Sequence, residues 1–172
     1  RANWFIPDAR KGWNRYAIRT GIEYIQKQNV DAIITTGPPH SSHLIGLNLS
    51  RKFNLPWVAD FRDPWTNIYY NHFLPRSSST QKKDLALETK VLRNASLVTV
   101  VSNGLLQEFS DRARSTLLLP NGYDLEDFYG KHTFEKSDKF TLSYIGNLKE
   151  NQNIEALWTA LSELIHANPQ FA

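Results

Sequence analysis

The chain of 172 residues contains no cysteine and no methionine, and it has no long apolar run. Without cysteine it can form no disulfide bond and offers no thiolate to a metal ion. No apolar stretch approaches the roughly 20 residues that a helix needs to cross a bilayer, and no signal-peptide pattern opens the sequence. We therefore expect a cytoplasmic location.

The sequence also lacks the motifs of several large enzyme classes. It contains no Gly-x-Gly-x-x-Gly fingerprint and no P-loop, so nothing in it supports a dehydrogenase or a P-loop nucleotidase. No Gly-x-Ser-x-Gly elbow surrounds Ser102, which favours a helix cap over a nucleophile. The net charge is only +3, too small to demand a nucleic-acid stripe. Basic residues gather at 10–19 and 76–90, either as solvated helix faces or as a surface for phosphates or an anionic membrane.

What is present is an alternation of helical and strand patterns. Apolar residues at helical spacing predict helices over 14–28, from Ser41 or Ser42 onward, over 82–94 and over 103–109. Short β-rich runs predict strands at 31–36, 57–61, 97–101 and 116–119. The strands are solidly apolar and hairpin signals are missing, which is typical of a parallel sheet covered on both faces. The sequence therefore predicts an α/β fold with a doubly wound parallel sheet.

The helix over 82–94 carries one polar residue in its apolar register, since Glu88 lies between Leu85 and Leu92 on one face.

After residue 123 the alternation of helical and strand patterns weakens. We expect a domain over 1–123, a polar linker over 124–139, and the start of a second domain over 140–172. The last part reads as a strand at 140–145, a Gly-Asn turn, and a helix at 153–167. One strand and one helix cannot bury a core alone, and the chain has no initiator methionine, so we expect a fragment of a longer protein.

Polar residues follow each predicted strand. Ligands of parallel α/β sheets bind at the carboxyl ends of the strands, so these residues are site candidates. They are His40 and Ser41 after the first strand, Asp60, Arg62, Asp63 and Trp65 around the end of the second, and Asn121 after the fourth. In the second unit they are Gly146, Asn147 and Lys149.

Each group also has a purely structural interpretation. The turn at 37–42 is either an anion site at a helix N-terminus or a rigid turn with a cap. His40 and His43 have the spacing of a metal pair but lack a third ligand, so we expect no metal. Arg62 between two carboxylates is either a clamp for sugar hydroxyls or phosphate, or part of an internal ion pair. Asp63 can act as a general base or orient an acceptor hydroxyl. Aromatic residues after Pro64 either contact a sugar ring or lipid tail, or pack beneath the loop.

Together the motifs resemble those of bacterial group 1 (family 4-like) glycosyltransferases. The resemblance rests on Asp-Ala-Ile-Ile-Thr-Thr-Gly-Pro-Pro-His-Ser-Ser-His at 31–43, Asp-Phe-Arg-Asp-Pro-Trp at 60–65, Asn-Gly-Tyr-Asp at 121–124 and Tyr-Ile-Gly-Asn-Leu at 144–148. It covers nearly the whole chain, and its motifs are specific in combination only. One departure concerns Arg62 and Asp63, which stand where many members of the family place a histidine near the transferred sugar.

The resemblance implies a GT-B fold of two Rossmann-like domains. The N-terminal domain would bind a saccharide or lipid-linked acceptor, and the C-terminal domain a nucleotide-sugar, which is a substrate and not a cofactor. The reaction would be a retaining, metal-independent transfer in surface polysaccharide or lipopolysaccharide biosynthesis, with peripheral contact to the inner face of the membrane. The implied catalytic residues are Asp63 and Arg62. The implied acceptor-side residues are Asp60, Trp65, His40, Ser41 and Asn121, and the implied donor-binding residues are Gly146, Asn147 and Lys149.

The family's first strand with its glycine loop and its donor carboxylate motif have no match in the chain, so this fragment alone is expected to be inactive. Two other interpretations stay open: a non-catalytic α/β module that binds a phosphosugar, and a nucleotide-sugar epimerase on the related two-domain fold. The epimerase would interconvert a free nucleotide-sugar without an acceptor, whereas the module would bind without turnover.

Overall fold

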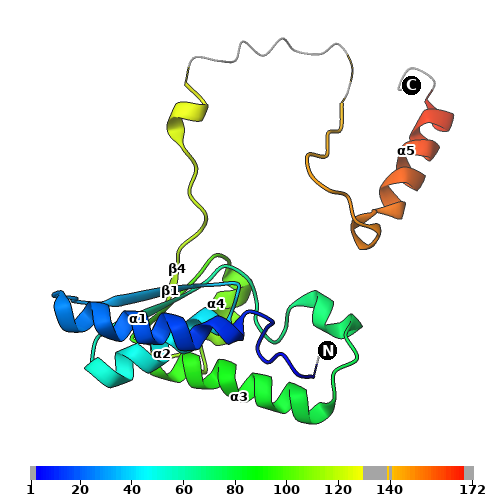
Figure 1. The fold of residues 1–172 in the computed structure, drawn as a ribbon. Helices are drawn as coiled ribbons and strands as arrows, with labels where there is room; N and C mark the ends of the chain where they lie inside the picture. Colours follow the sequence, from blue (N-terminus) through cyan, green and yellow to red (C-terminus); the bar gives the residue numbers. More distant parts are fainter. Residues whose placement is uncertain (1–2, 130–138, 140, 169–172) are drawn as a thin grey trace. The chain divides into compact units, whose positions relative to one another are not determined.

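A computed structural model describes residues 3–129, 139 and 141–168 of the chain. Contacts between residues divide it into two units, Arg1–Tyr123 and Asp124–Ala172. The first unit contains all four strands and helices α1 to α4, and the second contains α5 (Figure 1). No helix among the described residues combines the length and apolar character needed to cross a membrane.

The first unit is built on a parallel sheet of four strands. In sheet order these are β1 (Ile33–Gly37), β2 (Trp57–Phe61), β3 (Leu97–Val100) and β4 (Thr116–Leu118). Helix α1 (Asn14–Lys27) precedes β1, and the strands are joined by α2 (Ser41–Phe53), α3 (Ser78–Asn94) and α4 (Asn103–Phe109). The predicted α/β alternation is confirmed, and the architecture is compatible with a Rossmann-like fold.

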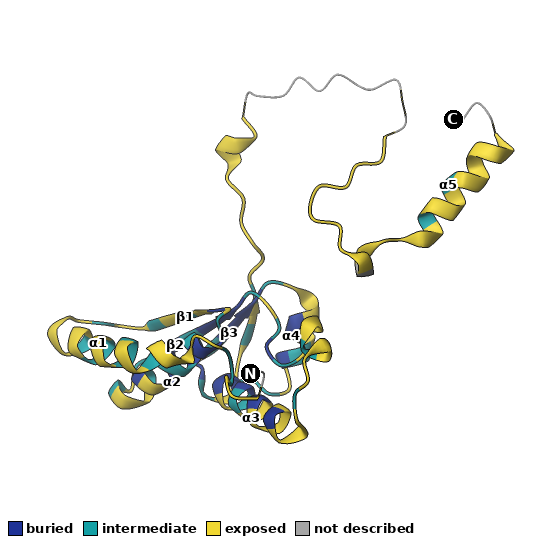
Figure 2. Ribbon diagram, turned by 45° about the vertical axis from the view of Figure 1, so that its right-hand side comes forward, coloured by how far each residue is buried: buried dark blue, intermediate teal, exposed yellow. Residues whose placement is uncertain are grey.

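In the described residues, helices cover only one face of this sheet. Trp57, Ala59 and Phe61 of β2 are fully buried among residues of α2, α3 and α4, and the helices α1–α3 lie on the same side of the strands in both views (Figures 1 and 2). On the opposite face Ile34 is 73% exposed and Leu117 is 49% exposed. This corrects the expectation of helices on both faces. The strand order in the sheet follows the order in the chain, so the sheet always grows in the same direction. Successive right-handed crossovers therefore place α2, α3 and α4 on the same face.

A close contact brings α2 onto β2. A Cβ added to Gly46 of α2 would lie 2.3 Å from Nε1 of Trp57, so only glycine lets the helix approach this closely. The Trp57 indole nitrogen donates to the Thr35 hydroxyl at 2.8 Å, which satisfies its polar atom inside the core. The helix and the first two strands are thereby fixed relative to one another.

Most predicted elements lie within a few residues of their expected bounds, with two differences. Helix α3 begins at Ser78 instead of Lys82, because the Ser77 hydroxyl accepts the Thr80 N–H and caps an additional turn. In the second unit the expected strand at 140–145 is not formed by the described residues 141–145. A strand needs a hydrogen-bonded partner, and none pairs with this segment in the described part of the unit. Phe140 and residues 130–138 of the expected linker lie outside the described residues. Helix α5 (Glu155–Ala167) forms as expected.

Candidate functional site

A row of polar side chains crosses three strands on the face of the sheet that the described helices leave free. Thr36 of β1, Asp60 of β2 and Thr99 of β3 stand directly opposite one another in the register. The Thr36 hydroxyl donates to Asp60 Oδ2 at 2.9 Å, and the Thr99 hydroxyl donates to Oδ1 at 2.6 Å. Because side chains alternate along a strand, Asp60 points away from the core that holds Ala59 and Phe61. The sheet itself therefore fixes the Asp60 carboxylate at its carboxyl edge.

Asp60 in turn holds Arg62. The Arg62 Nε donates to Asp60 Oδ2 at 2.7 Å, and its Nη1 donates to Asn121 Oδ1 at 2.9 Å. Burial alone would raise the pKa of Asp60, but the hydrogen bonds that it accepts, that from Thr99 foremost, and the Arg62 charge hold its pKa below the usual value. Asp60 is therefore an anion that positions Arg62. The Arg62 side chain is 37% exposed, so its remaining N–H groups can reach a ligand.

Asp63 differs from Asp60 in its surroundings. Its side chain is exposed, and among the described residues it makes neither a hydrogen bond nor an ion pair. The Asp63 carboxylate lies near Tyr70. Burial raises the pKa of Tyr70, and the negative charge of Asp63 raises that pKa further. A carboxylate that makes no hydrogen bond or ion pair with the described residues is free to accept a hydrogen bond from a ligand hydroxyl.

His40, in the turn after β1, and His43, in the first turn of α2, are buried and neutral. The His40 Nε2 donates to the Pro64 carbonyl at 3.1 Å, because a carbonyl can only accept, and burial lowers the pKa of His40. The His43 ring lies over Phe61 with centroids 4.4 Å apart, and burial lowers its pKa to about 3. In the part of the chain that the structure describes, no three potential metal-ligating residues lie together. His40 thus holds the backbone that follows Asp63.

The first turn of α2 resolves the alternative between an anion site and a capped turn. Asp8 Oδ2 accepts the Ser41 N–H at 2.7 Å, and Oδ1 accepts the Ser41 hydroxyl at 2.9 Å. A carboxylate of the chain itself therefore occupies this helix N-terminus. Ser41 is fully buried and contributes to the placement of Asp8 instead of facing a ligand.

Two buried carboxylates of α3 anchor the loop that follows Asp63. Asp84 accepts the Trp65 indole N–H at 2.8 Å and forms an ion pair with Arg76. Glu88 accepts the backbone N–H of Thr66 at 2.8 Å and its hydroxyl at 2.9 Å, and it pairs with Arg112. Trp65 is accordingly buried, whereas three aromatic residues further along the loop, Tyr69, Tyr70 and Phe73, are exposed.

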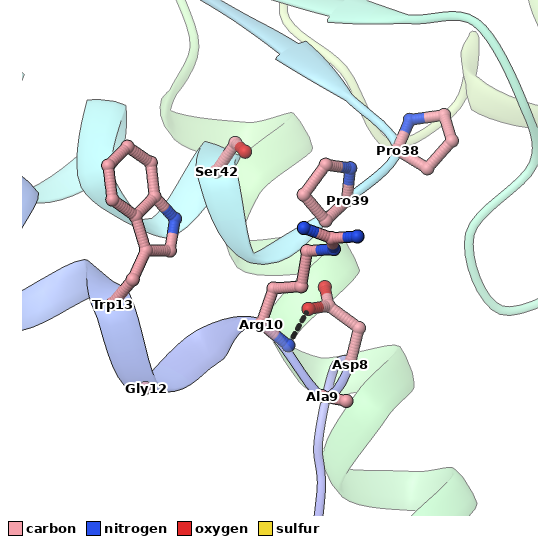
Figure 3. A pocket seen from close by; sticks show the side chains of 8 residues that line it. All are labelled: Asp8, Ala9, Arg10, Gly12, Trp13, Pro38, Pro39 and Ser42. Carbon is pink, nitrogen blue, oxygen red and sulfur yellow. Dashed lines mark hydrogen bonds between the residues drawn. The ribbon is translucent and has the colours of Figure 1, made fainter.

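Two hollows border the turn Pro38–Pro39. One of about 230 Å³ lies between this turn and the loop, with His40, Trp65 and Tyr70 in its wall. The other, of about 1020 Å³, opens toward the segment before α1 (Figure 3). Its lining residues are Asp8, Ala9, Arg10, Gly12, Trp13, Pro38, Pro39 and Ser42. The sequence patterns did not predict Asp8 as a site residue, and they indicated Arg10 only as part of the basic cluster at 10–19.

The candidates for donor binding belong to the second unit. Gly146 has φ +146°, a conformation that favours glycine. The N–H of Lys149 donates to Gln152 Oε1 at 3.1 Å, and the Tyr144 hydroxyl lies 3.5 Å from the Asn147 carbonyl oxygen. These contacts form a tight turn before α5.

The chain has no significant match among protein-family models, curated proteins or solved structures. The function therefore has to be argued from its own residues.

Proposed function

We propose that this chain belongs to a glycosyltransferase that moves a sugar from a nucleotide-sugar to a saccharide or lipid-linked acceptor. The observation that carries the proposal is the arrangement of Arg62 and Asp63. Arg62 is fixed by Asp60 and Asn121 at the carboxyl edge of a parallel sheet, and Asp63, the next residue in the chain, is exposed and makes no hydrogen bond or ion pair among the described residues. The motif resemblance of 60–65 and 121–124 points to the same chemistry.

The two side chains have complementary tasks in such a transfer. The Arg62 guanidinium can donate to the oxygens of a leaving diphosphate, where negative charge develops as the glycosidic bond breaks. Asp63 can accept a hydrogen bond from the acceptor hydroxyl and orient its oxygen toward the anomeric carbon. Because charge stabilisation comes from a guanidinium, the proposal includes no metal ion, and the resemblance favours retention of the anomeric configuration. Gly146, Asn147 and Lys149 are the proposed donor-phosphate contacts.

The outer face of α3 supports the proposed contact with the inner face of a membrane. Both acidic residues of this helix, Asp84 and Glu88, are buried against the loop and paired with arginines. Its exposed charged residues are therefore all basic, namely Lys82, Lys83, Lys90 and Arg93. Such a face is attracted to anionic lipids, as an enzyme of surface polysaccharide or lipopolysaccharide assembly would require.

The test is an assay of the natural protein that carries this chain with a panel of nucleotide-sugars, in the presence and absence of saccharide and lipid-linked acceptors. We expect release of nucleoside diphosphate that accelerates when the correct acceptor is added. Binding of a nucleotide-sugar without turnover would instead identify a non-catalytic module, and acceptor-independent interconversion of the sugar would identify an epimerase. Either result would overturn the proposal.

A further inference from the structure

The hollow of about 1020 Å³ shown in Figure 3 contains charged and aromatic groups that the proposed reaction does not use. Arg10 and Trp13 enter it from one side, and Ser42 and the Pro38–Pro39 turn form the other (Figure 3). The hollow adjoins the carboxyl end of β1 through this turn, so it lies at the same edge of the sheet as the Asp60 row.

Local geometry explains why Arg10 and Trp13 face the same space. Residues Lys11–Trp13 form a 3-10 turn with Arg10 as its N-cap, and the Trp13 N–H donates to the Arg10 carbonyl at 3.1 Å. In a 3-10 helix, side chains three positions apart eclipse one another. The spacing of Arg10 and Trp13 therefore places the guanidinium and the indole on one side of the turn.

The turn is tied to α2 through a single residue. Asp8 accepts the N–H and hydroxyl of Ser41, and the Asn14 side-chain amide donates to the Ser41 carbonyl at 2.8 Å. Asp8 and Asn14 flank the turn on either side, so Arg10 and Trp13 are held against α2 at both ends. The hollow is thus a fixed part of the fold.

Some of the groups that line the hollow already form hydrogen bonds within the chain, and others do not. Asp8 accepts three hydrogen bonds, two from Ser41 and one from the Arg10 N–H at 2.8 Å. In contrast, the Arg10 guanidinium and the Ser42 hydroxyl have no hydrogen-bond or ion-pair partner among the described residues, and Trp13 is 54% exposed. The uncommitted groups are therefore one cation, one hydroxyl and one aromatic face.

We infer that this hollow binds a phosphorylated sugar. The phosphate is held by charge-assisted hydrogen bonds from Arg10 and by the Ser42 hydroxyl, and the sugar ring lies on the Trp13 indole. An indole offers a rigid apolar face to the C–H groups of a ring, and a guanidinium matches the geometry of phosphate oxygens. As a binding site this stands on the contacts above.

The test follows the five tryptophan indole N–H signals by NMR in the ¹⁵N-labelled protein, with Trp13 assigned from a Trp13→Phe variant. The probes are glucose 1-phosphate, glucose and inorganic phosphate. We expect glucose 1-phosphate to shift the Trp13 signal saturably and to bind more tightly than either half alone. Absence of a saturable shift overturns the site. Equal affinity for inorganic phosphate overturns the role of Trp13, and equal affinity for glucose overturns that of Arg10.

Three variants and one control complete the test. Arg10→Gln and Trp13→Ala should each weaken glucose 1-phosphate binding by roughly tenfold or more, a loss expected for a charge-assisted pair or a stacked ring. Arg19→Gln removes the same charge from an exposed position on α1 and should leave the affinity unchanged. Gly12→Leu should leave the fold intact, since a Cβ at Gly12 meets no atom within 4 Å. Because Gly12 lines the hollow, the leucine side chain should fill it and abolish binding. Undiminished binding in Arg10→Gln or Gly12→Leu overturns the inference. Nucleotide-sugar turnover by the natural protein is measured separately, so a failure here leaves the proposed function standing.

Discussion

Asp8 caps helix α2 by accepting two hydrogen bonds from Ser41, which lies 33 positions further along the chain. The same contact closes a helix N-terminus that would otherwise attract an external anion, and it holds the segment that carries Arg10 and Trp13. A single carboxylate thus decides which part of this edge is available to a ligand.

Replacing this cap should destabilise the first unit. We expect Asp8→Ala to lower the free energy of unfolding by about 1–2 kcal/mol, because Ser41 loses its acceptor and the helix loses a favourable charge. Urea denaturation measures this loss. Asp31→Ala is the matched control, since Asp31 is exposed and makes no hydrogen bond or ion pair among the described residues, and it should change stability by no more than about 0.5 kcal/mol. Equal midpoints for the two variants would contradict the role of Asp8.

The packing of α2 on β2 predicts a contrast between two glycines. A Cβ at Gly46 would overlap the buried Trp57 indole at 2.3 Å, so Gly46→Ala should cost about 1–3 kcal/mol. At Gly104 of α4 the nearest atom would lie 3.9 Å away, so Gly104→Ala should be neutral or stabilise by about 0.5–1 kcal/mol. Thermal unfolding of both variants decides the matter, and a Gly46→Ala variant as stable as Gly104→Ala would show that the indole can move aside.

Glu88 should contribute far more to stability than an exposed glutamate. Glu88→Gln removes the charge that balances Arg112, and breaking such a buried pair costs about 3–5 kcal/mol, here at the lower end because the Arg112 side chain is 20% exposed. Glu23→Gln breaks an exposed pair with Arg19 on α1 and should cost at most about 0.5 kcal/mol. Similar denaturation curves for the two variants would mean that Glu88 does not anchor the loop.

The buried histidine pair predicts a loss of stability in acid. Burial lowers the pKa of His43 from 6.5 to about 3, so between these values the unfolded chain binds a proton that the folded chain does not. Stability therefore rises with pH across this window and is lost as pH falls, by about 1.4 kcal/mol per pH unit for one such proton. His40, whose pKa is also lowered by burial, adds to the slope. In His43→Gln the unfolding free energy should depend less steeply on pH across this window, because the proton that only the unfolded chain binds is removed. An unchanged slope in His43→Gln would show that His43 takes up protons in the fold.

Elements governed by local sequence could be predicted from it. The strand Trp57–Phe61 and the helix Asn103–Phe109 have their predicted bounds, because apolar runs, Pro64 and the Ser102 cap act over a few residues. The coverage of the sheet could not be predicted in this way. The coverage depends on the edge of the sheet to which each new strand is added. Solid apolar runs are compatible with helices on one face or on both.

The site shows the same division. The position of Asp60, Arg62 and Asn121 at the strand ends follows from the pattern of strands, and the structure brings these three together. His40, Ser41 and Trp65 also follow strands, but they are buried because the segments before α1 and after Asp63 fold back over them. Glu88 did leave a signal, since a carboxylate in the apolar register of a helix indicates a buried partner. The contact of Asp8 with Ser41 left none, because nothing local links positions so far apart.

The most direct test of the proposed function is the rate at which the natural protein releases nucleoside diphosphate from its nucleotide-sugar when Asp63 is replaced. Asp63→Asn should lower this rate roughly 10²-fold, because the acceptor hydroxyl loses the carboxylate that orients it. The unfolding midpoint should not change, because the side chain is exposed and makes no hydrogen bond or ion pair in the described structure. Arg62→Ala should lower it as well, and Asp31→Asn should not. A near-normal rate in both Asp63→Asn and Arg62→Ala would contradict the account.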